Sequence, residues 1–422
     1  MKTASPVIIV GAGPGGLYAA LCLAQLGIPS TVLERATFPR KKACGDILTS
    51  NVLRALHELD PALLDRLLAQ DWSLELNAST FASHQGNAVE VPFNSPSNQR
   101  LGLPSCIAAR RTEFDNFFYE YAAADPQVDI RPGCAVQSAE HTGNHWQIGA
   151  KTPTGTESFS GKMLLIAAGA NSPLVQTLVP GHQVRPRHSA VGLRAYFSGV
   201  TPGPRTDRSE FYLFDRKFMP GGVYITPFAD DLVNANLVLR YDIFRKRKTP
   251  LRELLEDYIA THPELAPRFR DAHLVAPPQG SRLSFGTRKR PLSAEGCLLI
   301  GDAAGLTDAT NANGIGHAMI SGRLAAQATA EAIVAGKLDQ KSLRHYDKAV
   351  YQRLHNALLP GKVMRYLFAN RVVSHLSASL LQSSFRRLNG KAIEELVYAG
   401  STTKTLIDPR FYLRLFSKEK AV

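Results

Sequence analysis

Three glycines near the start of the chain have the spacing that binds the pyrophosphate of a dinucleotide. Gly11, Gly13 and Gly16 follow an apolar, β-branched run at 7–10 and precede a helix-forming stretch at 17–26. In this arrangement the first glycine permits a tight turn, the second lets the backbone approach the pyrophosphate, and the third lets helix and strand pack closely. The helix N-terminus then stabilises the anion through free N–H groups and its dipole. The alternative is a glycine-rich turn that binds no ligand.

An acidic residue stands where the ribose of such a dinucleotide would lie. Residues 31–34 are typical of a second parallel strand, so the chain up to Glu34 is predicted to form a βαβ unit of about thirty residues. Glu34 follows Gly11 by 34 − 11 = 23 residues, and a carboxylate at about that spacing can accept hydrogen bonds from ribose hydroxyls. Strand, helix and acid together predict dinucleotide binding, but they do not separate NAD from FAD.

A second motif, at 298–305, favours FAD. It reads Leu-Leu-Ile-Gly-Asp-Ala-Ala-Gly and places Asp302 after a buried strand. Here the chain resembles the FAD-containing superfamily typified by p-hydroxybenzoate hydroxylase, in which the Asp of this motif holds the ribityl chain of FAD. The resemblance implies that Asp302 accepts sugar hydroxyls, and that Gly305 and residues 314–316 allow close approach to the flavin ring. The alternative is that Asp302 is only a helix N-cap.

A third motif, Arg111-Thr112-Glu113-Phe114-Asp115, resembles the R-x-x-F-D stretch of the same superfamily. The resemblance implies that Arg111 reaches the FAD phosphate or ribose as a charge-assisted donor. The alternative is a solvated arginine at a helix start, and the neighbouring Arg110 leaves the register open. The resemblance implies FAD contacts from Gly11, Gly13, Pro14, Gly15, Gly16, Glu34, Arg35, Cys44, Gly45, Arg111, Val136, Gly301, Asp302, Gly314 and Ile315.

The loop after the second strand contains Cys44-Gly45-Asp46 behind a basic run at 39–42. Within the superfamily this loop is most similar to the geranylgeranyl reductase family, which uses reduced FAD to saturate isoprenoid double bonds and has Cys-Gly near the flavin ring. We expect the basic run to favour the Cys44 thiolate if it lies close; the alternative is a small buried loop residue. The candidates near the reacting carbon are Cys44, Asp46 and Tyr224, in that order.

The chain departs from the family patterns at three places. Ala168 replaces an acid that follows the middle strand and helps to dock nicotinamide, which puts direct reduction by NAD(P)H in doubt. In the segment that matches the reductases' Y-x-W-x-F-P stretch only Pro227 survives, and Tyr224 is the sole large aromatic. After the Asp302 motif the family's Pro and Gly are replaced by Ala309 and Ala312, which stands between Asn311 and Asn313.

The pattern of elements predicts an α/β fold with an insertion. Buried strands at 163–168 and 298–300, with helices at 112–124 and 316–335, complete a Rossmann-type FAD-binding domain at 1–72, 105–185 and 285–336. Short alternating segments at 190–197, 210–214, 223–228 and 233–239 predict a largely antiparallel substrate domain at 73–104 and 186–284. Residues 337–422 form a basic helical C-terminal region. The whole resembles the p-hydroxybenzoate hydroxylase architecture.

The charge of the chain is concentrated at its end. The formal net charge is +13, and residues 337–422 hold 16 Lys+Arg against 6 Asp+Glu, a net of 16 − 6 = +10. A solvated helix face is one interpretation of this tail; peripheral membrane contact through arginines beside Leu and Phe, Arg365, Arg371, Arg386 and Arg387, is the other. No nucleic-acid pattern and no metal-ligand set is evident. Five scattered cysteines and no apolar run of 18 or more residues predict a cytoplasmic protein, and the second interpretation of the tail adds contact with a membrane surface.

These observations lead to three hypotheses of function. The first is an FAD-dependent oxidoreductase, most like the geranylgeranyl reductases, that transfers hydride from reduced flavin to a carbon–carbon double bond of a hydrophobic, isoprenoid-like substrate. The second is an FAD-dependent monooxygenase that hydroxylates an aromatic or related small molecule, since a fold does not fix a function. The third is a non-catalytic protein that binds a lipid or prenyl group. The electron donor, NAD(P)H or a reductase partner, and the oligomeric state are left open.

Overall fold

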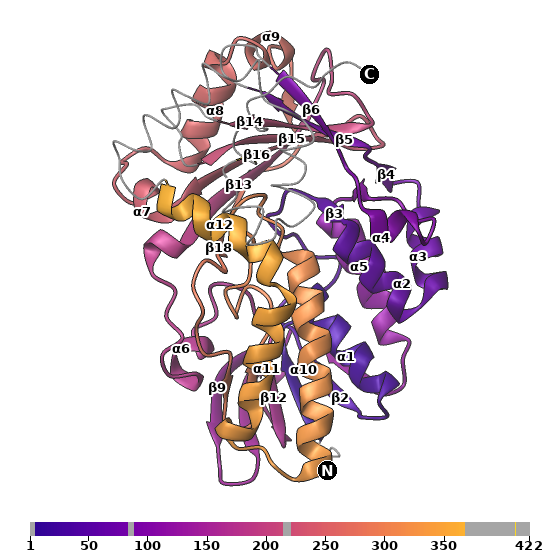
Figure 1. The fold of residues 1–422 in the computed structure, drawn as a ribbon, viewed down its shortest axis with the longest axis vertical. Helices are drawn as coiled ribbons and strands as arrows, with labels where there is room; N and C mark the ends of the chain where they lie inside the picture. Colours follow the sequence, from indigo (N-terminus) through magenta and orange to yellow (C-terminus); the bar gives the residue numbers. More distant parts are fainter. Residues whose placement is uncertain (1–4, 83–87, 214–220, 368–409, 411–422) are drawn as a thin grey trace.

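A computed structural model describes residues 5–82, 88–213, 221–367 and 410. Its lower half is built on a six-stranded sheet in the order β19-β20-β12-β1-β2-β8, parallel except for β19 (Figure 1). All four residues of the central strand β1 are buried, as its continuous apolar run predicts. The strands are β1 (Val7–Val10), β2 (Ser30–Leu33), β8 (Val128–Arg131), β12 (Met163–Ile166), β19 (Ser293–Ala294) and β20 (Cys297–Leu299).

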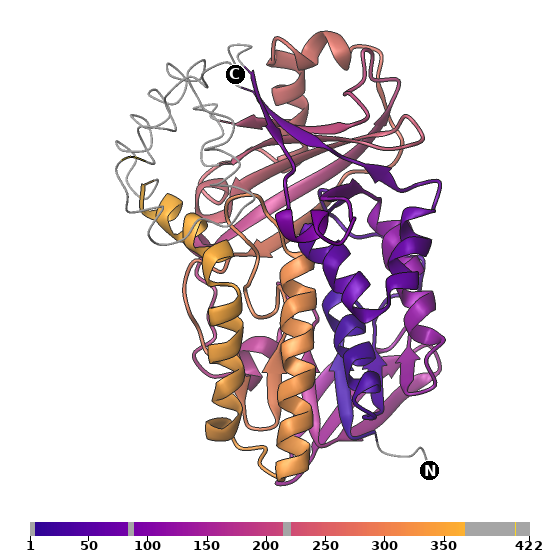
Figure 2. The same cartoon turned by 45° about the vertical axis from the view of Figure 1, so that its right-hand side comes forward.

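Two long helices pack on this sheet through glycines. Helices α1 (Pro14–Gln25) and α10 (Ile315–Ala335) lie side by side (Figures 1 and 2). A Cβ on Gly322 of α10 would stand 2.5 Å from the Gly15 carbonyl oxygen of α1, and one on Gly16 would stand 2.0 Å from the carbonyl oxygen of Gly11. At both glycines the backbones are in contact and leave no space for a side chain larger than a hydrogen atom. The start of α1 is therefore fixed in position against the strands.

An eight-stranded sheet forms the upper half, in the order β17-β13-β16-β15-β14-β5-β6, with β18 also paired to β13. The pairs are antiparallel, as the alternating segments predict, except that β14 and β5 run parallel. The strands are β5 (Ala78–Ala82), β6 (Ala88–Pro92), β13 (Ser189–Ser198), β14 (Arg208–Leu213), β15 (Gly221–Pro227), β16 (Val233–Arg240), β17 (His273–Leu274) and β18 (Gln279–Ser284).

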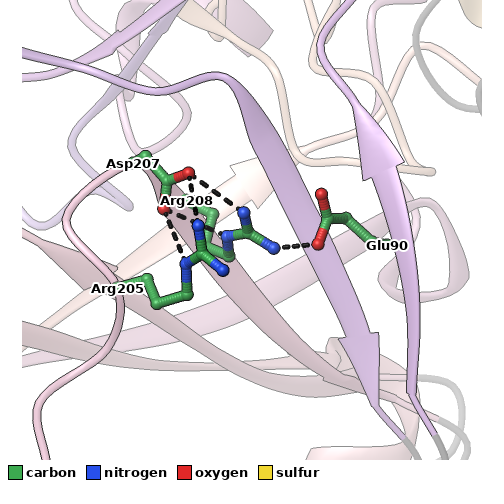
Figure 3. Close-up of polar contacts among 4 residues, drawn as sticks. All are labelled: Glu90, Arg205, Asp207 and Arg208. Atoms are coloured by element: carbon green, nitrogen blue, oxygen red, sulfur yellow. Dashed lines mark hydrogen bonds and ion pairs between the residues drawn. The ribbon is translucent and has the colours of Figure 1, made fainter.

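A cluster of charged side chains joins β6 and β5 to the rest of this sheet (Figure 3). Arg208 bonds Glu90 of β6 and lies 3.0 Å from an Asp207 oxygen, while Arg205 lies 3.1 Å from the same carboxylate. Hydrogen bonds from Arg208 and Arg205 hold the pKa of Asp207 below its usual range. Because Asp207, Arg205 and Glu90 are solvent-accessible, these pairs contribute little stability. Their role is to align β6, which comes from far earlier in the chain, with the rest of the sheet.

Smaller elements complete the fold, and sequence analysis predicted few of them. Two three-stranded sheets are present, one of them formed by β9, β10 and β11 and the other by β3, β7 and β4. Their bounds are β3 (Ile47–Thr49), β4 (Leu74–Glu75), β7 (Cys106–Ala108), β9 (Ala135–His141), β10 (Trp146–Thr152) and β11 (Gly155–Gly161). The remaining helices are α2 (Ser50–Leu59), α3 (Pro61–Leu68), α4 (Pro96–Gln99), α5 (Arg111–Ala123), α6 (Leu174–Leu178), η1 (Pro186–His188), α7 (Tyr241–Phe244), α8 (Leu251–Thr261), α9 (Leu265–Arg268), α11 (Gln340–Arg353) and α12 (His355–Leu367).

The helical C-terminal region is seen in α11 and α12, which continue from α10 along one side of the molecule (Figure 2). The arginines Arg371, Arg386 and Arg387 and most of the apolar residues expected beside them lie outside the described residues, as does the side chain of Arg365. Peripheral membrane contact therefore stays a prediction. Among the residues described, no helix combines the length and the apolar character needed to cross a membrane.

The contact between Gly16 and Gly11 is directly testable. In Gly16→Ala the new methyl group would meet a backbone oxygen that cannot move without displacing β1, so we expect the free energy of unfolding to fall by about 1–3 kcal/mol. Chemical denaturation measures this. Gly203→Ala is the control, because the nearest atom to a Cβ there is 3.5 Å away. Equal stability of the two variants would contradict the packing described here.

Candidate active site

A cavity of about 620 Å³ lies between the lower and upper sheets. It opens at the carboxyl ends of the parallel strands β1, β2, β12 and β20, where ligands bind in folds of this kind. Of the residues predicted to bind or closely approach FAD or substrate, all line the cavity except Gly16, Gly305 and Gly316. The lining members are Gly11, Gly13, Pro14, Gly15, Glu34, Arg35, Cys44, Gly45, Asp46, Arg111, Val136, Tyr224, Gly301, Asp302, Gly314 and Ile315.

The glycine end of the cavity is shaped for a phosphate group. Gly11 has φ +105°, and a Cβ there would stand 2.6 Å from the Ala167 carbonyl oxygen. Gly13 is the N-cap of α1 and supplies no side chain to the helix N-terminus. A Cβ on Gly13 would meet only the Arg40 guanidinium, at 3.6 Å. Backbone N–H groups, the helix dipole and one cation thus face an open space, which fits a diphosphate.

Glu34 is held rigidly at the end of β2. One carboxylate oxygen accepts the N–H of Ala12 at 2.8 Å, and the other accepts the N–H of Ala36 at 3.0 Å. Carboxylate oxygens accept more than one hydrogen bond each, so the group can still receive the hydroxyls of a ribose at the cavity wall. The contact with a ribose stays a prediction.

The structure settles the register of the arginine motif. Arg111 is buried in the first turn of α5, and its guanidinium forms two hydrogen bonds with Asp115, of 2.6 and 2.8 Å. Arg40 also contacts Asp115, at 3.1 Å. Arg110 instead pairs with Asp230 near the surface, at 2.7 Å. One carboxylate therefore holds two guanidinium groups at the cavity, so a donor for a phosphate or ribose is already fixed in place.

Asp302 lies on the opposite wall, in a turn after β20, and accepts a 2.5 Å hydrogen bond from the Thr307 hydroxyl. The N-cap of α10 is Gly314, so the alternative that Asp302 is a simple helix cap is wrong. A Cβ on Gly314 would stand 3.4 Å from an Asp302 oxygen. The glycine, which has no Cβ, therefore leaves space beside the carboxylate. This wall fits the sugar chain of the cofactor.

Three side chains of the upper sheet clamp the loop that carries Cys44, Gly45 and Asp46. Tyr196 of β13, Asn234 of β16 and Thr226 of β15 are direct cross-strand neighbours, and we call them the clamp row. They hold the loop through four hydrogen bonds, which are Tyr196 Oη to Asp46 Oδ2 (2.6 Å), Asn234 Nδ2 to Asp46 Oδ2 (3.0 Å), Asn234 Nδ2 to the Cys44 carbonyl (3.1 Å) and Thr226 Oγ1 to the Gly45 carbonyl (3.2 Å).

The clamp row gives Asp46 an unusual environment. The residue is fully buried at φ +60°, and burial raises the pKa of its carboxyl to about 7, against hydrogen bonding from Tyr196 and the fields of Arg194 and Arg111. Both donors reach Oδ2, while buried Oδ1 has no hydrogen-bond partner. When the carboxyl is protonated, the proton therefore resides on Oδ1.

The expectation for Cys44 needs correction. Burial raises the pKa of its thiol, although Arg111 lowers it in part, so the neutral thiol is favoured. Arg40 of the basic run pairs with Asp115, and the charged groups that act on the pKa of the thiol are Arg111 and Asp46. Cys44 lines the cavity, and a role for it near the reacting carbon stays a prediction.

A second transverse row of side chains runs beside the clamp row, and its four central members line the cavity. Its members are direct neighbours on six strands, and we call them the floor row: Gln279, Arg194, Asn236, Tyr224, Phe211 and Phe81. The three aromatic rings touch in sequence, with centroids 4.8 and 5.1 Å apart. Burial raises the pKa of Tyr224 to about 12, so its hydroxyl stays protonated. The sequence pattern indicated Tyr224 but not Arg194, Asn236 or Phe211.

The departures from the family patterns also lie at the cavity. Ala168 and the stretch 311–313 line it. Ala312 has φ +57°, a conformation that glycine adopts without strain. Asn311 and Asn313 stabilise this turn, because the Asn311 side chain accepts the N–H of Asn313 at 2.9 Å and the Asn313 amide donates to Thr49 at 3.0 Å.

Known proteins with similar sequences include reductases, and solved structures with a similar fold include a flavin-dependent enzyme. The family described as FAD binding domain matches residues 4–357. A menaquinone reductase of Mycobacterium tuberculosis is 30% identical over 329 residues, covering 76% of this chain and 75% of that protein. A digeranylgeranylglycerophospholipid reductase of Thermoplasma volcanium is 26% identical over 372 residues, covering 85% and 86%.

Solved structures share the fold at low identity. A geranylgeranyl bacteriochlorophyll reductase-like protein of Thermoplasma acidophilum superposes with a TM-score of 0.76 at 19% identity, covering 97% of this chain and 95% of that one. A flavin-dependent brominase superposes with a TM-score of 0.72 at 20% identity, covering 95% of each chain. These likenesses confirm the predicted architecture, in which a Rossmann-type lower half and an antiparallel upper sheet enclose one site.

Gly13 offers a test of the phosphate end. In Gly13→Asp a carboxylate would enter the space that faces the helix N-terminus, with little to collide with in the protein itself. We expect the flavin content per protein to fall about tenfold or more, because two negative charges would be brought into close contact. Flavin absorbance after reconstitution with FAD measures this. Gly203→Asp, which adds the same charge on a surface loop, should leave it unchanged.

Ala312 offers a test of backbone strain. Ala312→Gly should stabilise the apoprotein by up to about 1 kcal/mol, since relief of a left-handed alanine exceeds the entropy that glycine adds to the unfolded chain. The matched control is Ala69→Gly, at φ −79°, where the same change should destabilise. Thermal unfolding compares the two, and equal signs would contradict the strain.

Proposed function

From the premise that this chain belongs to the FAD binding domain family and is an FAD-dependent oxidoreductase, we propose that it reduces a carbon–carbon double bond of a hydrophobic, isoprenoid-like substrate. When bound, FAD supplies the hydride. Uptake of a hydride and a proton saturates an alkene, so the protein must provide a protected acid and an apolar wall for the chain. Relatives named as reductases of menaquinone and of a digeranylgeranyl lipid support this choice.

The observation that carries the proposal is the buried Asp46 carboxyl beside the floor row. Its pKa of about 7 leaves a large fraction protonated near neutral pH, as a general acid requires. Tyr196 and Asn234 fix the carboxyl through Oδ2, so that Oδ1 is the atom that holds and gives up the proton. Tyr224 and Phe211 supply an aromatic surface against which an apolar chain can pack.

Asp46→Asn should abolish most of the reduction without loss of the cofactor. We expect the turnover rate to fall by about 10²–10⁴-fold, the scale of general acid catalysis. In the native protein the rate should be highest below pH 7 and decline above it, as Asp46 Oδ1 loses its proton. Anaerobic conversion of a prenylated quinone or prenyl diphosphate, with product mass measured across pH, provides the readout.

Tyr196→Phe is the companion variant, because it removes a donor that favours the ionised carboxyl; its pH profile should shift upward. Asp46→Asn also tests the effect of this acid on the stability of the fold. A buried acid with a raised pKa stabilises the folded state below the pKa of the unfolded chain, and this contribution is lost as pH rises toward 7. Asp46→Asn should remove that loss. Normal turnover and an unchanged pH profile in Asp46→Asn would refute the role of the acid.

Oxygen dependence separates the two enzymatic hypotheses. A double-bond reductase forms its saturated product under argon once an electron donor is supplied, whereas a monooxygenase yields no hydroxylated product without O₂. Dithionite serves as the electron donor in this comparison, since Ala168 leaves open whether NAD(P)H or a partner protein reduces the bound flavin. A flavin-loaded protein that converts no alkene and no aromatic compound would favour the lipid-binding hypothesis.

A further inference from the structure

The floor row contains a buried cation that has no ion-pair partner among the residues described by the structure. Arg194 is 6% exposed, and it forms no ion pair with a carboxylate of the residues that the structure describes. Its guanidinium lies 4.0 Å over the ring of Tyr196, and Nη2 donates to Gln279 at 2.5 Å. Nε is buried without any partner. Burying a charge without an ion-pair partner is costly. We therefore expect a further group, outside the described chain, to bind the guanidinium.

The surroundings of Arg194 point to a ligand at the cavity. The residue lines the cavity, as does Asn236 directly across the strand pair. The Asn236 side chain forms no hydrogen bond with the described part of the chain and stands 3.6 Å from where a Cβ of Gly45 would lie. A guanidinium and an amide, both with donors to spare, therefore stand side by side at the wall next to the Asp46 loop.

The floor row changes character along its length. Gln279, Arg194 and Asn236 make its polar end, and Tyr224, Phe211 and Phe81 make its aromatic end. Neighbouring strands are about 4.8 Å apart. The polar side chains and the aromatic side chains therefore follow one another in a single line across the sheet. A molecule that is anionic at one end and apolar along the rest matches this sequence of side chains.

We propose that Arg194 and Asn236 bind an oxyanion at the head of the substrate, a phosphate or a carboxylate, while its isoprenoid chain lies over Tyr224 and Phe211. This assignment rests on the proposed function and names the substrate class of the same site. A guanidinium binds such oxyanions through paired N–H donors, and Nε, which lacks a partner, supplies one of them. The head group thus fixes which part of the chain reaches Asp46.

Binding of matched geranyl compounds tests the assignment without turnover. Geranyl phosphate, geranic acid and geraniol share one chain and differ in the head, and equilibrium dialysis against the FAD-loaded protein gives three dissociation constants. We expect at least one of the two anions to bind about tenfold or more tightly than the alcohol, the scale of a hydrogen bond to a charged group. The comparison of the phosphate with the carboxylate then identifies the head group.

Arg194→Met should erase this preference, while geraniol affinity stays within about threefold. Arg194→Lys keeps the charge but not the planar fork and should retain part of the preference. The control is Arg282→Met on β18, an arginine that stacks on Tyr241 and does not line the cavity; it should keep the full preference. Flavin absorbance and thermal unfolding confirm that each variant is folded.

Two results would overturn the assignment. One is equal affinity of the native protein for geraniol and both anions. The other is an equal loss of all three ligands, or of FAD, in Arg194→Met, which would assign the guanidinium to the fold or the cofactor. Neither result depends on reduction. Tight, Arg194-dependent anion binding by a protein that saturates no alkene would instead refute the proposed reaction and leave this binding site in place.

Discussion

The clamp between the upper sheet and the Cys44–Asp46 loop is the constraint on which the site depends. The loop follows β2 of the lower half and ends where β3 begins, whereas Tyr196, Asn234 and Thr226 belong to three strands of the upper sheet. Their hydrogen bonds join the two halves across the cavity. They also hold Asp46 in a left-handed conformation that costs roughly 1 kcal/mol or more in isolation. The same contacts that assemble the cavity therefore set the acidity of its buried carboxyl.

The cofactor end could be predicted from the sequence because its signals are local. Gly11, Gly13 and Gly16 act within one turn, and Asp302 follows directly on a buried strand. Arg110 and Arg111 could not be distinguished from the sequence, since one residue of register decides which arginine faces Asp115 and which faces solvent. Only the packing of α5 resolves that choice.

Apart from Asp46 and Tyr224, the substrate end could not be predicted, because its rows form by register across strands that are distant in sequence. Arg194, Asn236 and Phe211 become neighbours only when β13, β16, β15 and β14 pair, and a lone arginine in an alternating segment resembles a surface residue. Phe81 joins the row because β5 pairs with β14 in parallel, and nothing in the local sequence of β5 indicates this pairing. For Cys44 the sequence shows the basic run, but not the burial or the pairing of Arg40 that decide the state of the thiol.

The two rows are coupled through Tyr196, whose ring faces Arg194 and whose hydroxyl bonds Asp46. The positive fields of Arg194 and Arg111 favour the ionised carboxyl, against the larger effect of burial. An oxyanion bound at Arg194 would cancel much of the nearer field while excluding more water, and both changes favour the protonated acid. Substrate binding would thus hold the proton on Asp46 Oδ1 until an alkene carbon accepts it, whereas without a head group the carboxyl could release it to solvent.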